Sequence, residues 1–375
     1  MTTAPRPPGI LHVVDSLAFG GLERVVTDLA IAQHRRGHPV VVFSLGETAG
    51  FRAELQATGV PVVVGAKSRP FDLNLLRALR QTVADHRIDR VHAHNYVPNY
   101  HAATALLGLS RSPVQVCTCH DMGMRLTGRK LRWMYRLSLL RTARIALVSA
   151  PVRDHHIASG WVSAARSEVV MNGLPVDRFE PTAARRAAAR ASLGIGDSAP
   201  VIGCVGRLVE LKNQQLLVET MPPLLAIHPD LVLVLVGDGD RAAGLRERAA
   251  ALGVAHAVRF LGSRPMVHDL LCGFDLFALP SFTEGLSVAL LEACAAGLPI
   301  IASDVDGNRA VIRHATTGLL IPVDDRAAWL AAIGALLRDP AQRAQLGARA
   351  RQWAIAHAGI DTMYCAYEAF YRRAR

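Results

Sequence analysis

Short apolar runs alternate with longer amphipathic stretches along the whole chain. Runs of about five residues rich in Val and Ile are typical of strands buried on both faces. Between them lie stretches with helical periodicity, such as residues 22–36 and 73–86. Strands that alternate with helices predict parallel crossovers and an open, doubly wound sheet. In the first half of the chain the strand-like runs occupy residues 10–14, 40–44, 60–64, 90–94, 114–118 and 145–149.

The alternation stops between residues 171 and 200, a stretch that contains Pro175, Pro181 and Pro200 and an Ala/Arg segment at 183–191. It then resumes, with strand-like runs at residues 201–206, 231–237, 258–261, 276–279, 300–303 and 319–323. We therefore predict two α/β domains of Rossmann-like, doubly wound parallel sheets. Their expected bounds are residues 1–181 and 182–357.

Composition agrees with a folded protein of this size. Of the 375 residues, 51% are hydrophobic and 19% charged, which excludes a disordered chain. Six cysteines are too few for a disulfide-stapled secreted scaffold. No signal peptide and no run of about 18 uncharged apolar residues is evident, so we expect a cytoplasmic protein without an ordinary membrane span.

Basic residues outnumber acidic ones by 42 to 31, a net charge of +11. Such an excess favours an anionic partner, which could be nucleic acid, a membrane surface or a phosphorylated substrate. Residues 1–180 contain 22 basic and 13 acidic residues, and residues 181–375 contain 20 and 18. The excess therefore belongs to the first domain.

Three turns follow predicted strands, where doubly wound sheets bind ligands. The first contains Gly20 and Gly21, which allow the backbone to approach an anion at a helix start. An ordinary tight turn explains the pair equally well, and the pattern is not the G-x-G-x-x-G of dinucleotide sites. The second turn runs from Gly206 and carries Arg207 and Lys212, which could neutralise a diphosphate from two sides. The alternative for these two cations is a solvated helix start.

The third turn carries two carboxylates, Glu284 before a helix and Glu292 eight residues later. At about 1.5 Å per residue, they lie about 12 Å apart along the axis. That separation suits hydroxyl groups at opposite ends of an extended ligand, with the amides of residues 285–287 facing a phosphate between them. Because Glu292 lies among apolar residues, it needs a polar partner, which a hydroxyl-rich ligand could supply.

These motifs, in this order, resemble glycosyltransferase family 4, the retaining sugar-nucleotide transferases of the GT-B fold. Members have two Rossmann-like domains and an interdomain cleft. The resemblance extends over roughly residues 10–371. It rests on Gly-Gly-Leu-Glu-Arg at 20–24, His120-Asp121, Asn172-Gly173, Gly-Arg-Leu with Lys-Asn at 206–213, and the E-x7-E pair.

The resemblance implies a role for each matching residue. Arg207 and Lys212 would hold the donor diphosphate, and Glu292 the ribose hydroxyls. Glu284 would bind sugar hydroxyls, beside backbone N–H groups of Gly285, Leu286 and Ser287. His120 would contact the transferred sugar, while Gly20 and Gly21 would line the cleft floor and Gly206 would belong to the donor site. The terminal helix, about 358–375, would pack back on the first domain.

Three features depart from the family or suggest a metal. Where members commonly have Gly and Glu after the E-x7-E helix, this chain has Asp306 and Ala310. Asp238-Gly239-Asp240 spells a metal-binding D-x-D, but it follows a strand as a glycine turn. His92 and His94 share one strand face; since no third ligand is evident, a polar pair at the strand end is the preferred interpretation. We expect no metal and no cofactor, with a nucleoside-diphosphate sugar as co-substrate.

Residues 125–144 contain seven basic and no acidic residues. Arg125, Arg129, Arg132 and Arg136 recur at helical spacing, with Lys130 and Trp133 between them. A basic helix with interleaved Trp and Leu is typical of interfacial membrane binding. The alternative is a solvated helix whose apolar residues face the sheet. No nucleic-acid-binding motif is evident.

Together these features predict an enzyme that moves a sugar from a nucleoside-diphosphate sugar to a hydroxyl acceptor. The expected acceptor is a saccharide, in particular a lipid-linked one for cell-surface polysaccharide, presented at the anionic inner face of the cytoplasmic membrane. The alternatives are a soluble transferase acting on a small acceptor such as a sugar phosphate, and a non-catalytic basic binding module.

Overall fold

The computed structural model describes residues 6–46, 49–67, 72–110, 112–123, 126 and 128–374. The chain divides into two compact units, one of Met1–Asn172 with Ile360–Arg375 and one of Gly173–Gly359. The observed division precedes the boundary expected at residue 181, because Leu174 already belongs to the second unit: its N–H donates to the Ala358 carbonyl at 2.9 Å.

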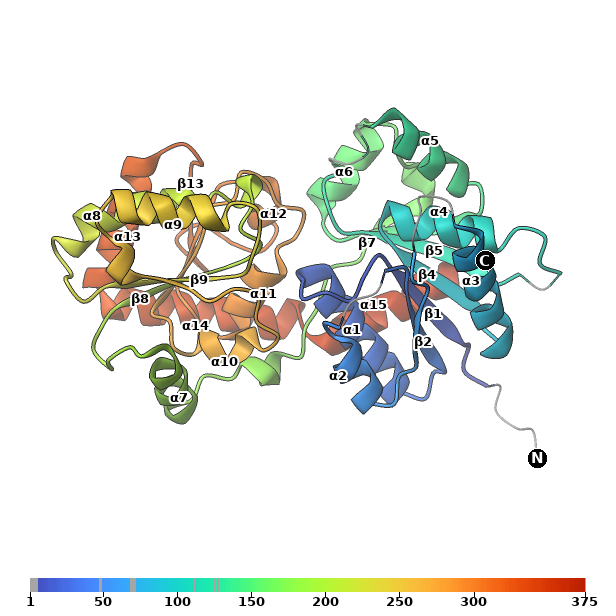
Figure 1. Ribbon diagram of the computed structural model, residues 1–375, viewed down its shortest axis with the longest axis horizontal. Coiled ribbons are helices and arrows are strands. Elements are labelled where there is room, and N and C mark those ends of the chain that lie inside the picture. The colour runs from blue at the N-terminus through green and yellow to red at the C-terminus, as the bar shows by residue number, and fades with distance from the viewer. Residues whose placement is uncertain are drawn as a thin grey trace. The chain divides into compact units, whose positions relative to one another are not determined.

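The first unit contains a parallel sheet of seven strands in the order β3-β2-β1-β4-β5-β6-β7 (Figure 1). The strands are β1 (Ile10–Val14), β2 (Val40–Ser44), β3 (Val62–Val64), β4 (Arg90–His94), β5 (Val114–Cys119), β6 (Thr142–Leu147) and β7 (Ser167–Val169). The helices are α1 (Gly21–Arg35), α2 (Arg52–Ala57), α3 (Leu73–Asp85), α4 (Tyr96–Ala105), α5 (Arg129–Ser138), α6 (Ala150–Ala158) and the terminal α15 (Ile360–Arg373).

The second unit contains a parallel sheet of six strands in the order β10-β9-β8-β11-β12-β13. The strands are β8 (Val201–Val205), β9 (Val232–Val236), β10 (Val258–Phe260), β11 (Leu276–Leu279), β12 (Ile300–Ser303) and β13 (Leu319–Ile321). The helices are α7 (Ala183–Leu193), α8 (Gln214–Leu225), α9 (Ala242–Ala251), α10 (Val267–Leu271), α11 (Val288–Ala295), α12 (Asp306–Arg309), α13 (Arg326–Arg338) and α14 (Pro340–His357). Helices α8, α9 and α13 cover one side of this sheet, and α10 and α14 lie on the other (Figure 1).

Two doubly wound parallel sheets confirm the predicted fold class. Most predicted strands have the expected bounds to within two residues, because central parallel strands are continuous apolar runs. The run expected at 145–149 is displaced, since β6 begins at Thr142. The short edge strand β7, Ser-Glu-Val, carries a single apolar residue and was not predicted. Among the described helices, none is long and apolar enough to span a membrane.

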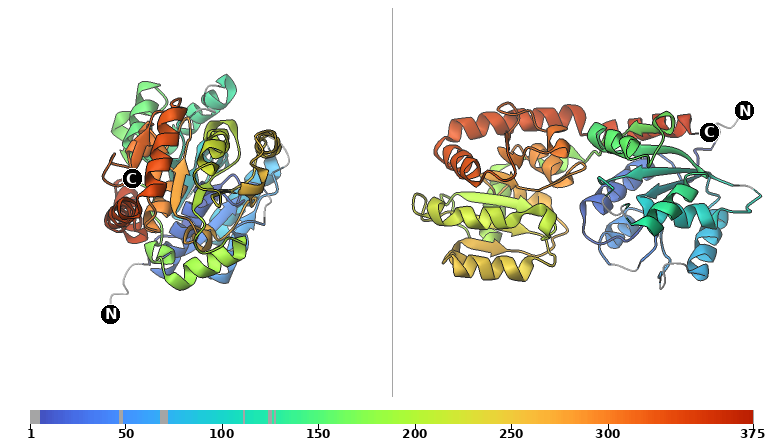
Figure 2. Two further views of the ribbon diagram at one scale, coloured as in Figure 1. Left: turned by 90° about the vertical axis from the view of Figure 1, so that its left-hand side faces the viewer. Right: turned by 90° about the horizontal axis from the view of Figure 1, so that it is seen from above.

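The C-terminal helix α15 belongs to the first unit, where it packs against α1 and β6. The right-hand view of Figure 2 shows this red helix beside blue and green elements of that unit. Tyr367 and Tyr371, one turn apart on the helix, are completely buried. Their hydroxyls lie within hydrogen-bonding distance of Thr118 at 3.1 Å and His92 at 2.8 Å, respectively. The helix therefore covers a polar part of the sheet.

That polar part consists of three histidines inside the strands. His12 of β1 lies in register with His92 of β4, and His94 follows two residues later on the same face. All three side chains are buried. Burial disfavours the charged imidazolium, which lowers the pKa of His12 to about 4 and the pKa values of His92 and His94 well below the usual range. The three imidazoles are therefore neutral at pH 7.

We expect these neutral histidines to make the first unit labile in acid. In the unfolded chain each histidine has a pKa of about 6.5. Below that pH the unfolded state therefore binds protons that the folded state does not bind, which stabilises the unfolded state. For His12 the loss of stability begins near pH 6.5 and ends near its folded pKa of about 4. Each such group lowers the free energy of unfolding by about 1.4 kcal/mol per pH unit within its window. Melting temperatures measured from pH 7 to pH 4 should fall accordingly.

His12→Gln should make this pH dependence shallower, because one neutral buried imidazole is removed. His155→Ala, at an exposed position of α6, is the matched control and should leave the slope unchanged. Equal melting temperatures at pH 7 and pH 4.5 in the parent protein would contradict the interpretation.

Candidate functional site

In each sheet the strand order reverses once, and the loops on either side of that reversal diverge to leave space for a ligand. In the second unit the reversal lies between β8 and β11. The loop after β8 carries Arg207 and Lys212, and the loop after β11 carries Glu284. The fold therefore brings these two predicted turns together, although they are far apart in sequence.

A partly buried ion pair joins the two loops. Lys212 Nζ donates to Glu284 Oε1 at 2.5 Å, and Ser281 Oγ donates to the same oxygen at 2.7 Å. The Glu284 side chain is 8% exposed and that of Lys212 is 20% exposed. In addition, Phe282 N–H donates to the Leu211 carbonyl at 2.9 Å. A cation and a carboxylate are thus held at the carboxyl ends of adjacent strands.

The loop after β8 is shaped by the glycine turn that follows β9. Gly237 has a φ of +136°, and a Cβ there would lie 2.0 Å from the Gly206 carbonyl oxygen. Leu208 N–H donates to the Asp238 carbonyl at 2.9 Å, which ties the two loops together. The Asp-Gly-Asp sequence at 238–240 therefore supports the neighbouring loop. Arg207 is exposed, and its own carbonyl accepts from Gln214 Nε2 at 2.9 Å.

The E-x7-E segment enters α11 through a capped N-terminus. Ser287 Oγ accepts from the Leu290 N–H, so the hydroxyl satisfies one first-turn amide. Residues 285–287, predicted to face a phosphate, are buried immediately before the helix. Glu292 lies on α11 and is 9% exposed. The buried carboxylate is thus fixed on a helix, whereas Glu284 lies in the loop before it.

The segment that departs from the family pattern packs directly on Glu284. A Cβ on Gly307 would lie 2.3 Å from the Glu284 carbonyl oxygen. Gly307 belongs to the short helix α12, whose Asn308 Nδ2 donates to the Ser303 carbonyl at 2.9 Å. The Asp306 side chain instead forms an ion pair with Arg309, with Oδ1 and Nη1 3.0 Å apart. Although Asp306 departs from the family pattern, the next residue is still the glycine that allows α12 to approach the Glu284 backbone closely.

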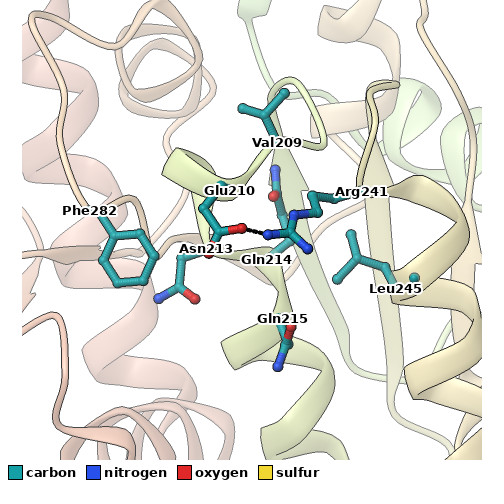
Figure 3. A pocket seen from close by; sticks show the side chains of 9 residues that line it. Val209, Glu210, Asn213, Gln214, Gln215, Arg241, Leu245 and Phe282 are labelled. Carbon is teal, nitrogen blue, oxygen red and sulfur yellow. Dashed lines mark ion pairs between the residues drawn. The ribbon is translucent and has the colours of Figure 1, made fainter. Parts of the chain in front are cut away.

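A pocket of about 270 Å³ lies beside the same loop (Figure 3). An ion pair between Glu210 and Arg241 crosses it, and Phe282 lies at the opposite end from Arg241. The pocket shares the loop that carries Lys212, but none of the predicted donor-binding residues line it.

In the first unit the strand order reverses between β1 and β4. Gly20 and Gly21 follow β1 at the start of α1, and His120 follows β5, the neighbour of β4. The His120 N–H donates to Asn95 Oδ1 at 2.8 Å. Asn95, directly after β4, has φ +66° and ψ −176°, a region that only glycine adopts without strain. The strained residue is therefore the one whose side chain accepts a hydrogen bond from the backbone of His120.

The three strand histidines are residues of a type that binds metal ions, and one ring nitrogen from each lies within 4.8 Å of the other two. His12 is the third member that the sequence did not indicate. The geometry favours a hydrogen-bonded group instead. His12 Nδ1 lies 3.0 Å from His94 Nε2, so these two nitrogens are paired with each other. Every ring nitrogen of the three also has a hydrogen-bonding partner.

Two further polar residues escaped prediction, Gln33 on α1 and Asn95 after β4. Gln33 is completely buried in the last turn of α1, and full burial is uncommon for a glutamine. The one available sequence signal is that His12 and His92 occupy equivalent positions in two strands that a doubly wound order makes neighbours.

Helix α5 presents a basic and apolar outer face. Arg129, Lys130, Trp133 and Arg136 are exposed, and Arg132 is partly buried. Arg125 lies outside the described residues, and because α5 begins at Arg129 the predicted stripe of four arginines is reduced to three on this helix. The side facing the core carries Tyr135 and Ser138, which are buried, and Leu131 and Met134, which pack on the core of the first sheet.

The 125–144 segment is therefore not one continuous helix. Residues from Thr142 belong to β6, and Arg144 pairs with Glu168 at 3.3 Å.

The close approach of Gly307 to Glu284 generates a prediction. Gly307→Ala should displace the Glu284 backbone and lower the free energy of unfolding of the second unit by about 1–3 kcal/mol, because a Cβ cannot fit. Urea unfolding of both proteins measures the difference. Gly244→Ala, on the exposed side of α9 with open space around it, is the control and should not destabilise the protein. Equal stability of the parent and Gly307→Ala would contradict the contact.

Comparison with known proteins agrees with this architecture. Residues 19–178 match the family described as Glycosyltransferase Family 4, and residues 185–353 match Glycosyl transferases group 1. The crystal structure of Anabaena HepE in complex with UDP and glucose superposes with a TM-score of 0.86 at 21% identity, covering 97% of this chain and 99% of that one.

Two curated relatives are similar in sequence. D-inositol 3-phosphate glycosyltransferase of Corynebacterium urealyticum is 34% identical over 235 residues, 60% of this chain; the match spans only about half, 55%, of that relative's length. GDP-mannose-dependent alpha-(1-6)-phosphatidylinositol monomannoside mannosyltransferase of Mycobacterium tuberculosis H37Rv is 30% identical over 318 residues, 78% of each chain. With this coverage by sequence, and with the same two-sheet fold, the chain belongs to glycosyltransferase family 4.

Proposed function

We propose that this protein is a retaining glycosyltransferase that moves a sugar from a nucleoside-diphosphate sugar to a hydroxyl group. The observation that carries the proposal is the joining of Lys212 and Glu284 at the point where the strand order of the second sheet reverses. A cation there can bind phosphate oxygens, and a carboxylate beside it can accept hydrogen bonds from sugar hydroxyls. Retention is inferred from family membership.

In this proposal the second unit binds the donor. Lys212 and the exposed Arg207 hold the diphosphate and stabilise the departing nucleoside diphosphate, because its negative charge increases as the glycosidic bond breaks. Glu292 accepts from the ribose hydroxyls. Glu284 accepts from the sugar hydroxyls, beside backbone N–H groups of residues 285–287. Gly206 allows the backbone turn that precedes Arg207.

The first unit supplies the remaining contacts. We assign His120 a contact with the transferred sugar, and Gly20 and Gly21 a lining position at the start of α1. In a D-x-D enzyme a metal ion neutralises the negative charge of the diphosphate. Here Arg207 and Lys212 neutralise that charge. We therefore propose catalysis without metal or other cofactor.

The outer face of α5 supports a membrane-bound acceptor. Trp133 and Leu137 of α5 are 64% and 46% exposed, and Leu140, just beyond the end of the helix, is 83% exposed. Exposed Arg129, Lys130 and Arg136 are on the same helix. Basic residues around exposed Trp and Leu suit the headgroup region of an anionic membrane. We propose a cytoplasmic protein that binds peripherally at the inner face of the membrane and extends a lipid-linked saccharide for cell-surface polysaccharide.

The names of the two curated relatives support different acceptors. Phosphatidylinositol monomannoside is a lipid, in line with the face of α5. Inositol 3-phosphate is a small phosphorylated acceptor, which favours a soluble transferase as the second candidate.

Donor turnover tests the activity. Purified protein with membrane-lipid acceptor should consume one of the UDP-, GDP- or ADP-sugars, and Lys212→Ala and Glu284→Ala should each lower kcat/KM by about 100-fold or more, because preorganised charge is lost. Glu247→Ala, at an exposed position of α9, is the control and should retain activity. Parent protein that neither binds nor turns over any of these donors would instead support a non-catalytic binding module.

Liposome flotation tests the membrane surface. The protein should float with phosphatidylglycerol-rich vesicles at low salt and less at 0.5 M salt, because screening weakens the attraction. Trp133→Ser with Leu137→Ser should reduce flotation at least fivefold. Ile227→Ser, an exposed apolar residue of the second unit, should not change it. Equal recovery with phosphatidylcholine and phosphatidylglycerol vesicles would exclude the membrane surface and favour the small acceptor.

A further inference from the structure

A chain of hydrogen bonds runs through the interior of the first unit from Gln33 to His120. Gln33 Oε1 lies 2.7 Å from His12 Nε2. His12 Nδ1 lies 3.0 Å from His94 Nε2, and His94 Nδ1 lies 3.1 Å from His120 Nε2. The first three members are buried, so no water competes for these contacts. Three of the four residues have had no role in the site so far.

The direction of every bond in this chain follows from its first member. The Gln33 carbonyl oxygen can only accept, so His12 Nε2 carries the hydrogen. A neutral imidazole has one N–H, which leaves His12 Nδ1 as an acceptor and makes His94 Nε2 the next donor. By the same rule His94 Nδ1 accepts from His120 Nε2. The rule requires neutral rings. Burial lowers the pKa of His120 to about 3, and it also lowers the pKa values of His12 and His94.

A second branch is consistent with the same orientation of the Gln33 amide. Gln33 Nε2 donates to the Tyr371 hydroxyl at 3.3 Å. That hydroxyl is then able to donate to His92 Nδ1 at 2.8 Å, and His92 Nε2 to Thr118 Oγ1 at 2.7 Å. Both amide atoms of Gln33 are used, and each ring carries one hydrogen. Helix α15 thus contributes to the orientation of the amide that begins the chain.

This chain of hydrogen bonds ends at an atom that lacks a hydrogen-bonding partner. His120 Nδ1 is buried and has no hydrogen-bonding partner among the residues that the structure describes. Since Nε2 carries the hydrogen, Nδ1 bears the lone pair and can only accept. Buried polar atoms normally have a partner, so a buried acceptor without one at the carboxyl edge of a sheet indicates a missing ligand donor.

We propose that Gln33, His12 and His94 are positioning residues, which hold His120 as the Nε2–H tautomer so that its Nδ1 accepts a hydrogen bond from a hydroxyl group of the bound saccharide. The proposal rests on the assignment of His120 to the sugar in the proposed function. It adds which ring nitrogen faces the ligand, which partner donates, and which residues determine this. An Nδ1–H tautomer would present a donor instead and would leave the hydroxyl hydrogen without an acceptor.

The tautomers can be read directly from protein labelled with ¹⁵N-histidine, using long-range ¹H–¹⁵N correlation spectra at pH 7.5. We expect His12, His94 and His120 to be Nε2–H in the parent protein. Gln33→Met, which removes the obligate acceptor at similar volume, should give mixed tautomers at His94 and His120. Gln81→Met, at an exposed position on α3, is the matched control.

The parent spectrum alone can overturn the proposal: His120 as Nδ1–H, or as a mixture, contradicts the deduced direction whether or not Gln33→Met folds. A single unchanged tautomer in Gln33→Met would show that Gln33 does not determine it. A stoichiometric Zn²⁺ that replaces these hydrogen bonds, detected by elemental analysis, would also overturn it.

Kinetics supplies the functional readout. Gln33→Met should lower kcat/KM for transfer by about 10- to 100-fold, because a contact with the reacting sugar is misoriented. The dissociation constant for the nucleoside diphosphate alone should not change, since its proposed ligands lie in the second unit. Adding Gln33→Met to His120→Ala should cost no more than His120→Ala alone. An inactive parent protein would refute the proposed function, and the tautomers would still be measured independently.

Discussion

A parallel sheet covered by helices on both sides can carry unpaired polar groups only where its strands end, because its interior offers no water to satisfy them. Both units obey this constraint, and it determines where chemistry can occur. In the second unit, β8 and β11 are neighbours although the chain forms β9 and β10 between them. Lys212 and Glu284 are 72 residues apart in sequence, and that crossing brings them to 2.5 Å. The ion pair is a consequence of strand order, and its loops are fixed by glycines that permit backbone contact.

The first unit does carry polar side chains inside its sheet, and there each of them is paired. His12, His92 and His94 lie within strands, where apolar residues are expected, and each ring nitrogen is matched by a polar atom from another element. Part of that compensation comes from α15, at the far end of the sequence. Without Tyr367 and Tyr371 this face of the sheet would contain unsatisfied buried groups. The return of the terminal helix therefore completes the interior of the first unit.

The sequence predicted more of the fold than of this interior. Val- and Ile-rich runs identify central strands because burial on both faces requires them, so β1, β2, β4, β11 and β12 were located at their observed bounds. The edge strand β7 lacks that signal, since an edge has less apolar surface to bury. Motifs indicated Lys212, Glu284 and His120 as candidate site residues, because each motif is a local run of the sequence. Gln33 and His12 are single polar residues, and only strand register and helix packing bring them together.

Charge is treated in opposite ways inside and outside the first unit. Its surface holds the basic excess of the chain, concentrated in part on α5, whereas its interior holds imidazoles that must stay uncharged. A proton added to any ring between Gln33 and His120 would give that ring two N–H groups, and one of them would face a neighbouring N–H. The order of donors and acceptors therefore exists only while every ring is neutral. Deep burial lowers stability in acid, but it also preserves that neutrality at physiological pH. The same desolvation that lowers stability in acid keeps the Nδ1 lone pair of His120 available to accept a hydrogen bond.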